Sequence, residues 1–419
     1  MVLSQCWDST DRLTRQTVEA ADGELLQHRT YTYRPDGYVT EIRELTSGTR
    51  RFDLDTMGRV TGVQAHGWTE KYAYDAAGNQ SRAEAPAHPS PGEREHDGTL
   101  VRRAGRTTYE HDAAGRLIRK TRKLLNGQTR TWTYTWNVQD RLISATNPGG
   151  EEWHYAYDPL GRRISKSGPD GRTLVFTWDG TRLAEQTAEN GTTTTWDYSP
   201  GTHRPIAQTT RDPLVRAPAF HAIVTDTVGA PTELLTPEGA LAWQSRTTLW
   251  GTPLPSPTGT ADCPLRFPGQ YADPETGLNY NYFRYYDPET ARYLTPDPLG
   301  LDPAPNHQLY VENPCTYSDP LGLAKCPNEV RAEFSSLRKG STNRTRLVDT
   351  PEELRNLFDK WVEGAEKLPA RGPKVPEVYK LEDGTVVQWR TSSTSGGETI
   401  DMIYPESNKP RKIHIKPPE

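Results

Sequence analysis

A short motif recurs about every 20 residues along the first part of the chain and limits its fold more than any other feature. Its consensus is an aromatic residue, an aspartate or its substitute, two variable residues, a glycine, an arginine and an aliphatic residue, and single copies depart from it. The clear copies are Tyr74-Asp75-Ala76-Ala77-Gly78-Asn79, His111-Asp112-Ala113-Ala114-Gly115-Arg116-Leu117 and Tyr157-Asp158-Pro159-Leu160-Gly161-Arg162-Arg163. One copy is as long as a β-hairpin with its turns, and a lone hairpin is only marginally stable in water. The repeat therefore predicts hairpins that stack into one continuous sheet.

The local sequence and the composition agree with this prediction. Aspartate followed by glycine is typical of turns, and the alternation in Thr131-Trp132-Thr133-Tyr134-Thr135-Trp136 is typical of a strand. The chain contains 11 Trp and 20 Tyr, residues that favour strands over helices. Its four cysteines are scattered, which argues against a disulfide framework and a zinc site. We expect no metal ion and no cofactor.

Sequence patterns of membrane proteins and of secretory precursors are missing from this chain. No run of about 18 apolar residues occurs, so a membrane span is excluded. The N-terminal Met1-Val2-Leu3-Ser4-Gln5 has neither the charged nor the apolar part of a signal peptide. If this chain leaves its cell, we expect it to be secreted or injected without a signal peptide.

The string Asp-Pro-Leu-Gly-Leu occurs twice, at 297–301 and at 319–323, and the repetitive sequence ends with the second copy. Two carboxyl groups that share a proton can hydrolyse a peptide, because the ionised one activates water while the protonated one polarises the carbonyl. Asp297 and Asp319 are the candidates for such a pair. The alternative interpretation is that each string only forms a turn. A turn and a catalytic pair are compatible.

The segment that leads to these strings carries the most specific motifs of the chain. They are Arg266-Phe267-Pro268-Gly269-Gln270-Tyr271, Asp273-Pro274-Glu275-Thr276-Gly277-Leu278, Arg284-Tyr285-Tyr286-Asp287-Pro288 and Ala291-Arg292-Tyr293-Leu294. With the repeats, they make residues 1–323 closely resemble the Rhs and YD-repeat family of polymorphic toxins. The resemblance implies a mainly β chain in which a cocoon-like YD-repeat shell, complete or incomplete, is followed by a toxin domain. The implied domains are YD/Rhs repeats at 1–210, a core-associated region with an autocleavage motif at 211–323 and a toxin domain at 324–419.

The same resemblance implies a chemical role for the two aspartates. Asp297 and Asp319 would form an aspartyl dyad that cuts the bond between Leu323 and Ala324. Arg292 is expected to hold one of the two carboxylates ionised.

The tail is predicted to be a small α+β domain with a capped helix and an antiparallel sheet. Thr350-Pro351-Glu352-Glu353 is a capping box, and apolar residues at helical spacing follow it, from Leu354 to Ala365. Strand patterns come next, at Val378–Leu381, Thr385–Arg390, Thr399–Tyr404 and Arg411–Lys416.

Alternation along these strands predicts a polar open face opposite the helix. It gathers Arg390, Thr399, Asp401, Lys412 and His414, with Gln388, Ser393 and Lys416 as substrate-binding residues. Such a set suits RNA cleavage without metal, because histidine takes the 2′-OH proton and cations stabilise the phosphorane. The pattern also loosely resembles the barnase, EndoU, colicin and RelE superfamily of ribonucleases. A solvated strand face is the alternative interpretation of the same pattern.

Other functions remain open for the tail. Arg390 followed by Thr391-Ser392-Ser393-Thr394-Ser395 is similar to part of an ADP-ribosyltransferase motif, although the Glu-x-Glu of that motif is missing. Another type of nuclease, or a non-enzymatic β-repeat carrier with an inert tail, is also compatible with the sequence. The family resemblance implies a cognate immunity protein and a secretion-system delivery component, with the toxin acting in the cytoplasm of the target cell, and the polar face predicts RNA as the substrate.

Overall fold

The computed structural model describes residues 1–8, 12–255, 259–301, 304–323, 334, 337–340, 342, 344–362, 365–381, 385–393, 397–403 and 410–416. The chain divides into two compact units, Met1–Lys325 and Cys326–Glu419, which are considered separately below. The domain boundaries expected after residues 210 and 323 stay predictions. In the part of the chain that the structure describes, no helix has the length and apolarity that crossing a membrane requires.

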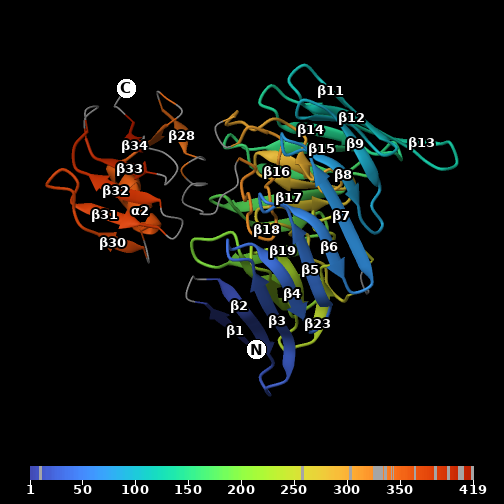
Figure 1. The fold of residues 1–419 in the computed structure, drawn as a ribbon, viewed down its shortest axis with the longest axis horizontal. Coiled ribbons are helices and arrows are strands. Elements are labelled where there is room, and N and C mark those ends of the chain that lie inside the picture. Colours follow the sequence, from blue (N-terminus) through green and yellow to red (C-terminus); the bar gives the residue numbers. More distant parts are fainter. Residues whose placement is uncertain are drawn as a thin grey trace. The chain divides into compact units, whose positions relative to one another are not determined.

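The first unit is built on a sheet of 23 strands, in which each strand pairs antiparallel with the next one in the sequence (Figure 1). The strands are β1 (Val2–Trp7), β2 (Leu13–Glu19), β3 (Leu25–Tyr33), β4 (Val39–Glu44), β5 (Gly48–Leu54), β6 (Val60–Ala65), β7 (Trp68–Tyr74), β8 (Gln80–Glu84), β9 (Gly92–Asp97), β10 (Leu100–Ala104), β11 (Thr107–His111), β12 (Leu117–Lys123), β13 (Thr129–Trp136), β14 (Leu142–Thr146), β15 (Glu152–Tyr157), β16 (Arg163–Ser167), β17 (Thr173–Asp179), β18 (Arg182–Ala188), β19 (Thr193–Tyr198), β20 (Pro205–Arg211), β21 (Ala219–Thr225), β22 (Pro231–Leu235) and β23 (Leu241–Gln244). The predicted stack of hairpins is confirmed.

The turns between these strands explain why aspartate, glycine and arginine recur. Asp112 Oδ1 accepts hydrogen bonds from the backbone N–H groups of Ala114 (2.9 Å) and Arg116 (3.0 Å), and Gly115 has a φ of +78°. The Arg116 side chain pairs with Asp112 Oδ2 and also donates to the Asn137 carbonyl of the next repeat at 2.9 Å. Each turn is thus closed by its own aspartate and joined to its neighbour by its arginine. Similar aspartate contacts occur in the turns of Asp55, Asp75 and Asp158.

The aromatic residue of the repeat joins neighbouring hairpins as well. Tyr157 Oη donates to the Leu142 carbonyl at 2.8 Å, and Trp178 Nε1 donates to the Arg163 carbonyl at 2.9 Å. In both cases the strand register shifts at the aromatic residue. Such a bulge turns the side chain toward the preceding strand.

We expect Asp112→Ala to lower the free energy of unfolding of the first unit by about 1–2 kcal/mol, because two backbone donors lose their acceptor. Urea denaturation followed by tryptophan fluorescence measures this loss. Asp97→Ala is the control, since Asp97 forms an exposed ion pair with Arg102 that contributes about 1 kcal/mol at most. Equal effects of the two substitutions would contradict the role of the turn.

A second, smaller sheet packs on one face of the repeats. It is antiparallel and contains β24 (Tyr271–Asp273), β25 (Leu278–Asn281), β26 (Arg284–Asp287) and β27 (Arg292–Tyr293). Its aromatic side chains share hydrophobic clusters with repeat residues: Tyr286 and Tyr293 pack with Val60 and Tyr72, for example. These clusters bury the core of the unit between the two sheets.

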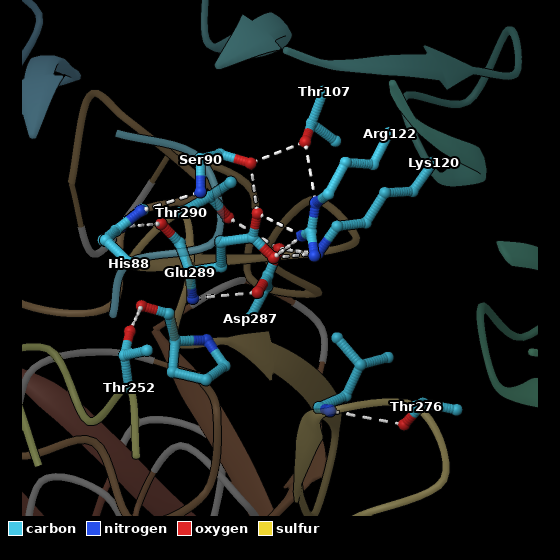
Figure 2. Close-up of polar contacts among 12 residues, drawn as sticks. His88, Ser90, Thr107, Lys120, Arg122, Thr252, Thr276, Asp287, Glu289 and Thr290 are labelled. Atoms are coloured by element: carbon cyan, nitrogen blue, oxygen red, sulfur yellow. Dashed lines mark hydrogen bonds and ion pairs between the residues drawn. The ribbon is translucent and has the colours of Figure 1, made fainter. Parts of the chain in front are cut away.

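A buried ionic network holds the turn between β26 and β27 against the repeats. Figure 2 shows the Glu289 carboxylate between Lys120, Arg122 and the hydroxyl of Ser90, all of which contact it. Burial alone would raise the pKa of Glu289, but Lys120 and Arg122 outweigh burial and lower that pKa to about 2. The network therefore fixes the two strands that carry Arg284 and Tyr293.

The second unit contains one layer of sheet with a helix on it (Figure 1). Its elements are β28 (Arg338–Lys339), β29 (Thr345–Val348), α2 (Pro351–Trp361), β30 (Glu366–Leu368), β31 (Glu377–Lys380), β32 (Val386–Arg390), β33 (Thr399–Ile403) and β34 (Arg411–Ile415). The order in the sheet is β28-β29-β34-β33-β32-β31-β30. All pairs are antiparallel except β29 and β34, which run parallel.

The predicted helix start is confirmed, and its end differs. Thr350 Oγ1 accepts the N–H of Glu353 at 3.1 Å, while the Glu353 side chain accepts the N–H of Asp349 at 2.8 Å. The helix ends at Trp361, earlier than the apolar pattern to Ala365 suggested. Ala365 still packs on the core, but from the connection that follows the helix.

Candidate functional site

The second Asp-Pro-Leu-Gly-Leu string folds as a repeat turn that lacks its arginine. Leu323 N–H donates to Asp319 Oδ1 at 2.9 Å, as Arg162 N–H does to Asp158 Oδ1. Gly322 has a φ of +68°. In the repeats the arginine at the fifth position pairs with Oδ2 of the aspartate. Leucine stands there instead, so Asp319 Oδ2 accepts from donors outside its own turn.

Arg284 joins the two predicted aspartates. Its Nη2 lies 2.8 Å from Asp297 Oδ2 and 3.2 Å from Asp319 Oδ2. All three residues are buried, with exposed fractions of 2% for Arg284, 7% for Asp297 and 1% for Asp319. The structure therefore brings together the two carboxylates that the sequence singled out.

The two carboxylates have different surroundings. Burial raises the pKa of Asp297 to about 7, against the opposing effect of Arg284. Asp319 receives hydrogen bonds from Tyr293 Oη at 2.8 Å and from the Leu323 N–H, in addition to its contact with Arg284. Donors to a carboxylate favour its ionised form. Asp297 is thus suited to carry a proton, while Asp319 is held by three donors.

Arg292 does not make the contact that was expected of it. Its Nη1 donates to Asn79 Oδ1 at 2.8 Å, and its Nη2 donates to Asn306 Oδ1 at 3.1 Å. Burial lowers its pKa to about 9. The prediction was wrong in the choice of arginine, because the Arg292 side chain extends to the repeat turns whereas Arg284 reaches the aspartates. The sequence offered no signal that separates the two.

The segment that precedes the predicted cut is tightly enclosed. A Cβ atom on Gly322 would lie 2.6 Å from the Asn281 carbonyl oxygen, so glycine is required there. The Gly322 carbonyl accepts a hydrogen bond from Arg284 Nε, and the Leu321 carbonyl accepts one from the Phe283 N–H at 3.1 Å. Leu323 itself is 4% exposed. Ala324, on the other side of the predicted cut, lies outside the described residues.

In the second unit, strand register places the predicted residues on one face in two adjacent rows. Arg390, Thr399 and His414 are directly opposite one another on β32, β33 and β34. The next row contains Gln388, Asp401 and Lys412. The opposite face, with Trp389, Ile400 and Ile413, packs on α2.

This polar face is not open, which corrects the expectation from the sequence. Thr399 is 0% exposed and Asp401 is 1% exposed. Asp401 Oδ2 accepts hydrogen bonds from Arg390 Nε at 2.9 Å and from Gln388 Nε2 at 3.1 Å. Arg371, from the connection before β31, reaches the same face and donates to Gln388 Oε1 at 3.2 Å. Asp401 therefore positions Arg390 and lies too deep to meet a large substrate.

The remaining predicted residues differ in their placement. His414 is half-buried and its pKa is lowered by burial and by Lys412, with Asp401 opposing. Lys416 directly follows β34, and its N–H donates to the Val348 carbonyl at 2.8 Å. Ser393 lies in the connection after β32, where its N–H donates to the Gly397 carbonyl. Only His414 of these three belongs to the rows. No group of three or more His, Cys, Asp or Glu side chains in the described ranges is arranged to hold a metal ion.

Comparison with known proteins agrees with this architecture. Residues 1–307 match the family model "Teneurin YD-shell". "Probable deoxyribonuclease RhsA" of Dickeya dadantii (strain 3937) is 34% identical over 441 residues, which cover 95% of this chain and 30% of that protein. "Double-stranded DNA deaminase toxin A" of Burkholderia cenocepacia (strain H111) is 35% identical and is matched over 71% of this chain and 22% of its own length. The chain thus spans less than a third of these relatives.

A solved structure shows the same fold. It is described as "Crystal Structure of TcdB2-TccC3 without hypervariable C-terminal region", with a TM-score of 0.59 and 20% identity over 77% of this chain and 18% of that one. The repeats, the smaller sheet and the family match all lie in the first unit. The chain belongs to the teneurin YD-shell family, as a protein of the Rhs/YD-repeat polymorphic toxin type.

Proposed function

We propose that this chain is part of a bacterial Rhs-type toxin that cleaves itself after Leu323 and releases the domain that follows. The observation that carries the proposal is the seating of the cut segment on the carboxylate pair. The Leu323 N–H is bound by Asp319, and Arg284 contacts both Asp319 and Asp297. A peptide held at two carboxylates with unequal proton affinity meets the requirements of acid–base hydrolysis.

Each group then has one task. Asp319 takes a proton from water as the water oxygen attacks the carbonyl carbon of Leu323, and Asp297 gives its proton to the carbonyl oxygen. The tetrahedral intermediate breaks at the bond to the Ala324 nitrogen, which receives from Asp319 the proton taken from water and leaves as an amine, while a hydroxyl of the intermediate returns its proton to Asp297. Arg284 stabilises the negative charge that develops between the two carboxylates.

Expression of the full chain and of Asp319→Asn tests this proposal. We expect intact mass spectrometry to find a wild-type fragment that begins at Ala324, and an uncut Asp319→Asn chain. The substituted amide keeps the turn, since its oxygen still accepts the Leu323 N–H, so the uncut variant should still unfold cooperatively in urea. A cut Asp319→Asn chain, or a wild-type cut at another bond, would overturn the assignment.

We propose further that the released domain cleaves RNA without a metal ion. The support is the row in which His414 lies opposite Thr399 and two strands from Arg390, with Lys412 beside it. This arrangement places a base on the same face as two cations that could stabilise a phosphorane. Two relatives are named as probable deoxyribonucleases, and this favours DNA as the second candidate substrate. A cognate immunity protein, a delivery component and action in the target-cell cytoplasm are part of the proposal.

We expect the His414→Ala chain to cleave RNA about 10²- to 10⁴-fold more slowly than the wild-type chain, since this is the usual contribution of one general base. Total RNA and plasmid DNA, each with EDTA, are incubated with the self-cleaved protein and separated on gels. Lys367→Ala is the control, because Lys367 is exposed on β30, away from the rows. Degradation of DNA alone would replace the ribonuclease by a deoxyribonuclease. Intact nucleic acids together with labelling from NAD would favour an ADP-ribosyltransferase.

A further inference from the structure

Arg338, a residue that the proposed function does not use, shares a row with His414. It pairs with Leu347 across β28 and β29, and Leu347 pairs with His414 across β29 and β34. The row continues through Thr399 to Arg390. Residues that are directly opposite on neighbouring strands point to the same face of a sheet. Five strands therefore present Arg338, Leu347, His414, Thr399 and Arg390 along one line.

The geometry of this row is symmetrical about the histidine. Neighbouring strands lie about 4.8 Å apart, so Arg338 and Arg390 each start about 10 Å from His414, on opposite sides of it. Arg338 is exposed. Arg390 is 29% exposed in its side chain and is held by Asp401. Both guanidinium groups are therefore able to meet a ligand that passes above the buried Thr399 and over His414.

The parallel pair β29–β34 also gathers positive charge. Its two strands, with β28 and the residues next to them, carry several cations and no acidic side chain among the described residues of 337–348 and 410–416. On the His414 face these cations are Arg338, Lys412 and Lys416. The neighbouring Arg346 points to the other face, where it lies over the Phe334 ring. The cations on the His414 face thus form a positive strip that flanks the row on both sides of His414.

We infer that this row is the track of a nucleic-acid strand, with Arg338 and Arg390 binding backbone phosphates on either side of the phosphodiester at His414. The inference deepens the proposed ribonuclease function and rests on it. It adds Arg338 as a phosphate-binding residue and sets the direction of the substrate, across the strands from β28 to β32. A row about 20 Å long with an arginine at each end and one histidine at its centre suits a polyanion with evenly spaced charges.

Salt-dependent binding by the full chain tests this track. The probe is a fluorescein-labelled single-stranded 20-mer RNA, titrated at 50 to 200 mM NaCl against the His414→Gln chain, which keeps the RNA intact. Adding Arg338→Gln should weaken binding severalfold and reduce the slope of log K against log salt by about 0.7, the value for one lost phosphate contact on a single strand. Lys367→Gln, an exposed cation on the far strand β30, is the matched control and should leave the slope unchanged.

Two outcomes would overturn the inference. One is an Arg338→Gln chain with an unchanged slope, or a Lys367→Gln chain with the same loss. The other is equal, Arg338-dependent binding of a poly-aspartate peptide, which would make the strip a docking surface for an acidic protein. If RNA binding depends on Arg338 but the wild-type chain cuts no RNA, the proposed nucleic-acid track is supported and the proposed ribonuclease is refuted. The two failures are therefore distinguishable.

Discussion

Replacing Asp297 by asparagine is expected to slow self-cleavage on the order of 10⁴-fold, the range measured when one member of a catalytic set is removed. An amide cannot supply the proton that the carbonyl oxygen needs. The side-chain contacts of the site are otherwise kept, because the amide oxygen of the replacement can still accept the Leu299 N–H that Asp297 Oδ1 now accepts at 2.8 Å. Pulse-chase labelling of chain synthesis, with the two fragments resolved on gels, gives the first-order rate constant.

The pH dependence of the wild-type rate checks the same assignment. Asp297 acts in its protonated form, and its pKa is raised to about 7. The rate should therefore be level somewhat below pH 7 and fall tenfold for each unit above it. Purified chain, refolded from denaturant into buffers from pH 5.5 to 9, shows this profile.

Asp97→Asn is the matched control, since this aspartate is exposed and distant in sequence from the site. It should cleave at the wild-type rate. A rate that rises above pH 7, or an Asp297→Asn chain that cleaves within a few-fold of wild type, would remove Asp297 from the reaction and leave Asp319 with another partner.

Much of the first unit follows from the sequence because its interactions are local. Asp112, Gly115 and Arg116 close their own turn, so the spacing of the motif is also the spacing of its contacts. The two aspartates of the site were found for the same reason, since each belongs to a repeat-like string. The substitution of the fifth-position arginine by Leu323 is a signal in the sequence that Asp319 Oδ2 has another partner.

Contacts between distant segments could not be predicted in the same way. Arg284 and Arg292 lie in neighbouring strands of similar composition, and only the packing of β26 and β27 on the repeats decides which of them reaches the aspartates. In the second unit the alternation of β32 to β34 predicted the polar face correctly. Alternation does not encode pairings between distant segments, such as Leu347 with His414. The burial of the polar face depends on such pairings. So does the parallel strand β29, which brings Arg338 into the row.

The buried network at Glu289 provides the second large effect. We expect Glu289→Gln to lower the free energy of unfolding of the first unit by about 3–5 kcal/mol, because Lys120 and Arg122 lose the carboxylate that compensates their buried charges. Lys120 is 5% exposed and Glu289 is 7% exposed, so water cannot replace the lost partner. The substitution changes the charge and keeps the size of the side chain, which separates electrostatics from packing. Equilibrium denaturation at pH 7 measures the loss, with the exposed Glu84→Gln as a control that should leave the midpoint unchanged.

The pH dependence of stability gives an independent check with a definite sign. The pKa of Glu289 is lowered to about 2 in the folded chain, against about 4.3 when unfolded. Its contribution is therefore complete above about pH 4.3 and is lost as the pH falls toward 2. The difference in stability between the wild type and Glu289→Gln should shrink over this window and stay constant from pH 5 to 7. A difference that persists unchanged at pH 2 would mean that the glutamine disturbs packing, and that the charge of Glu289 does not hold the β26–β27 turn on the repeats.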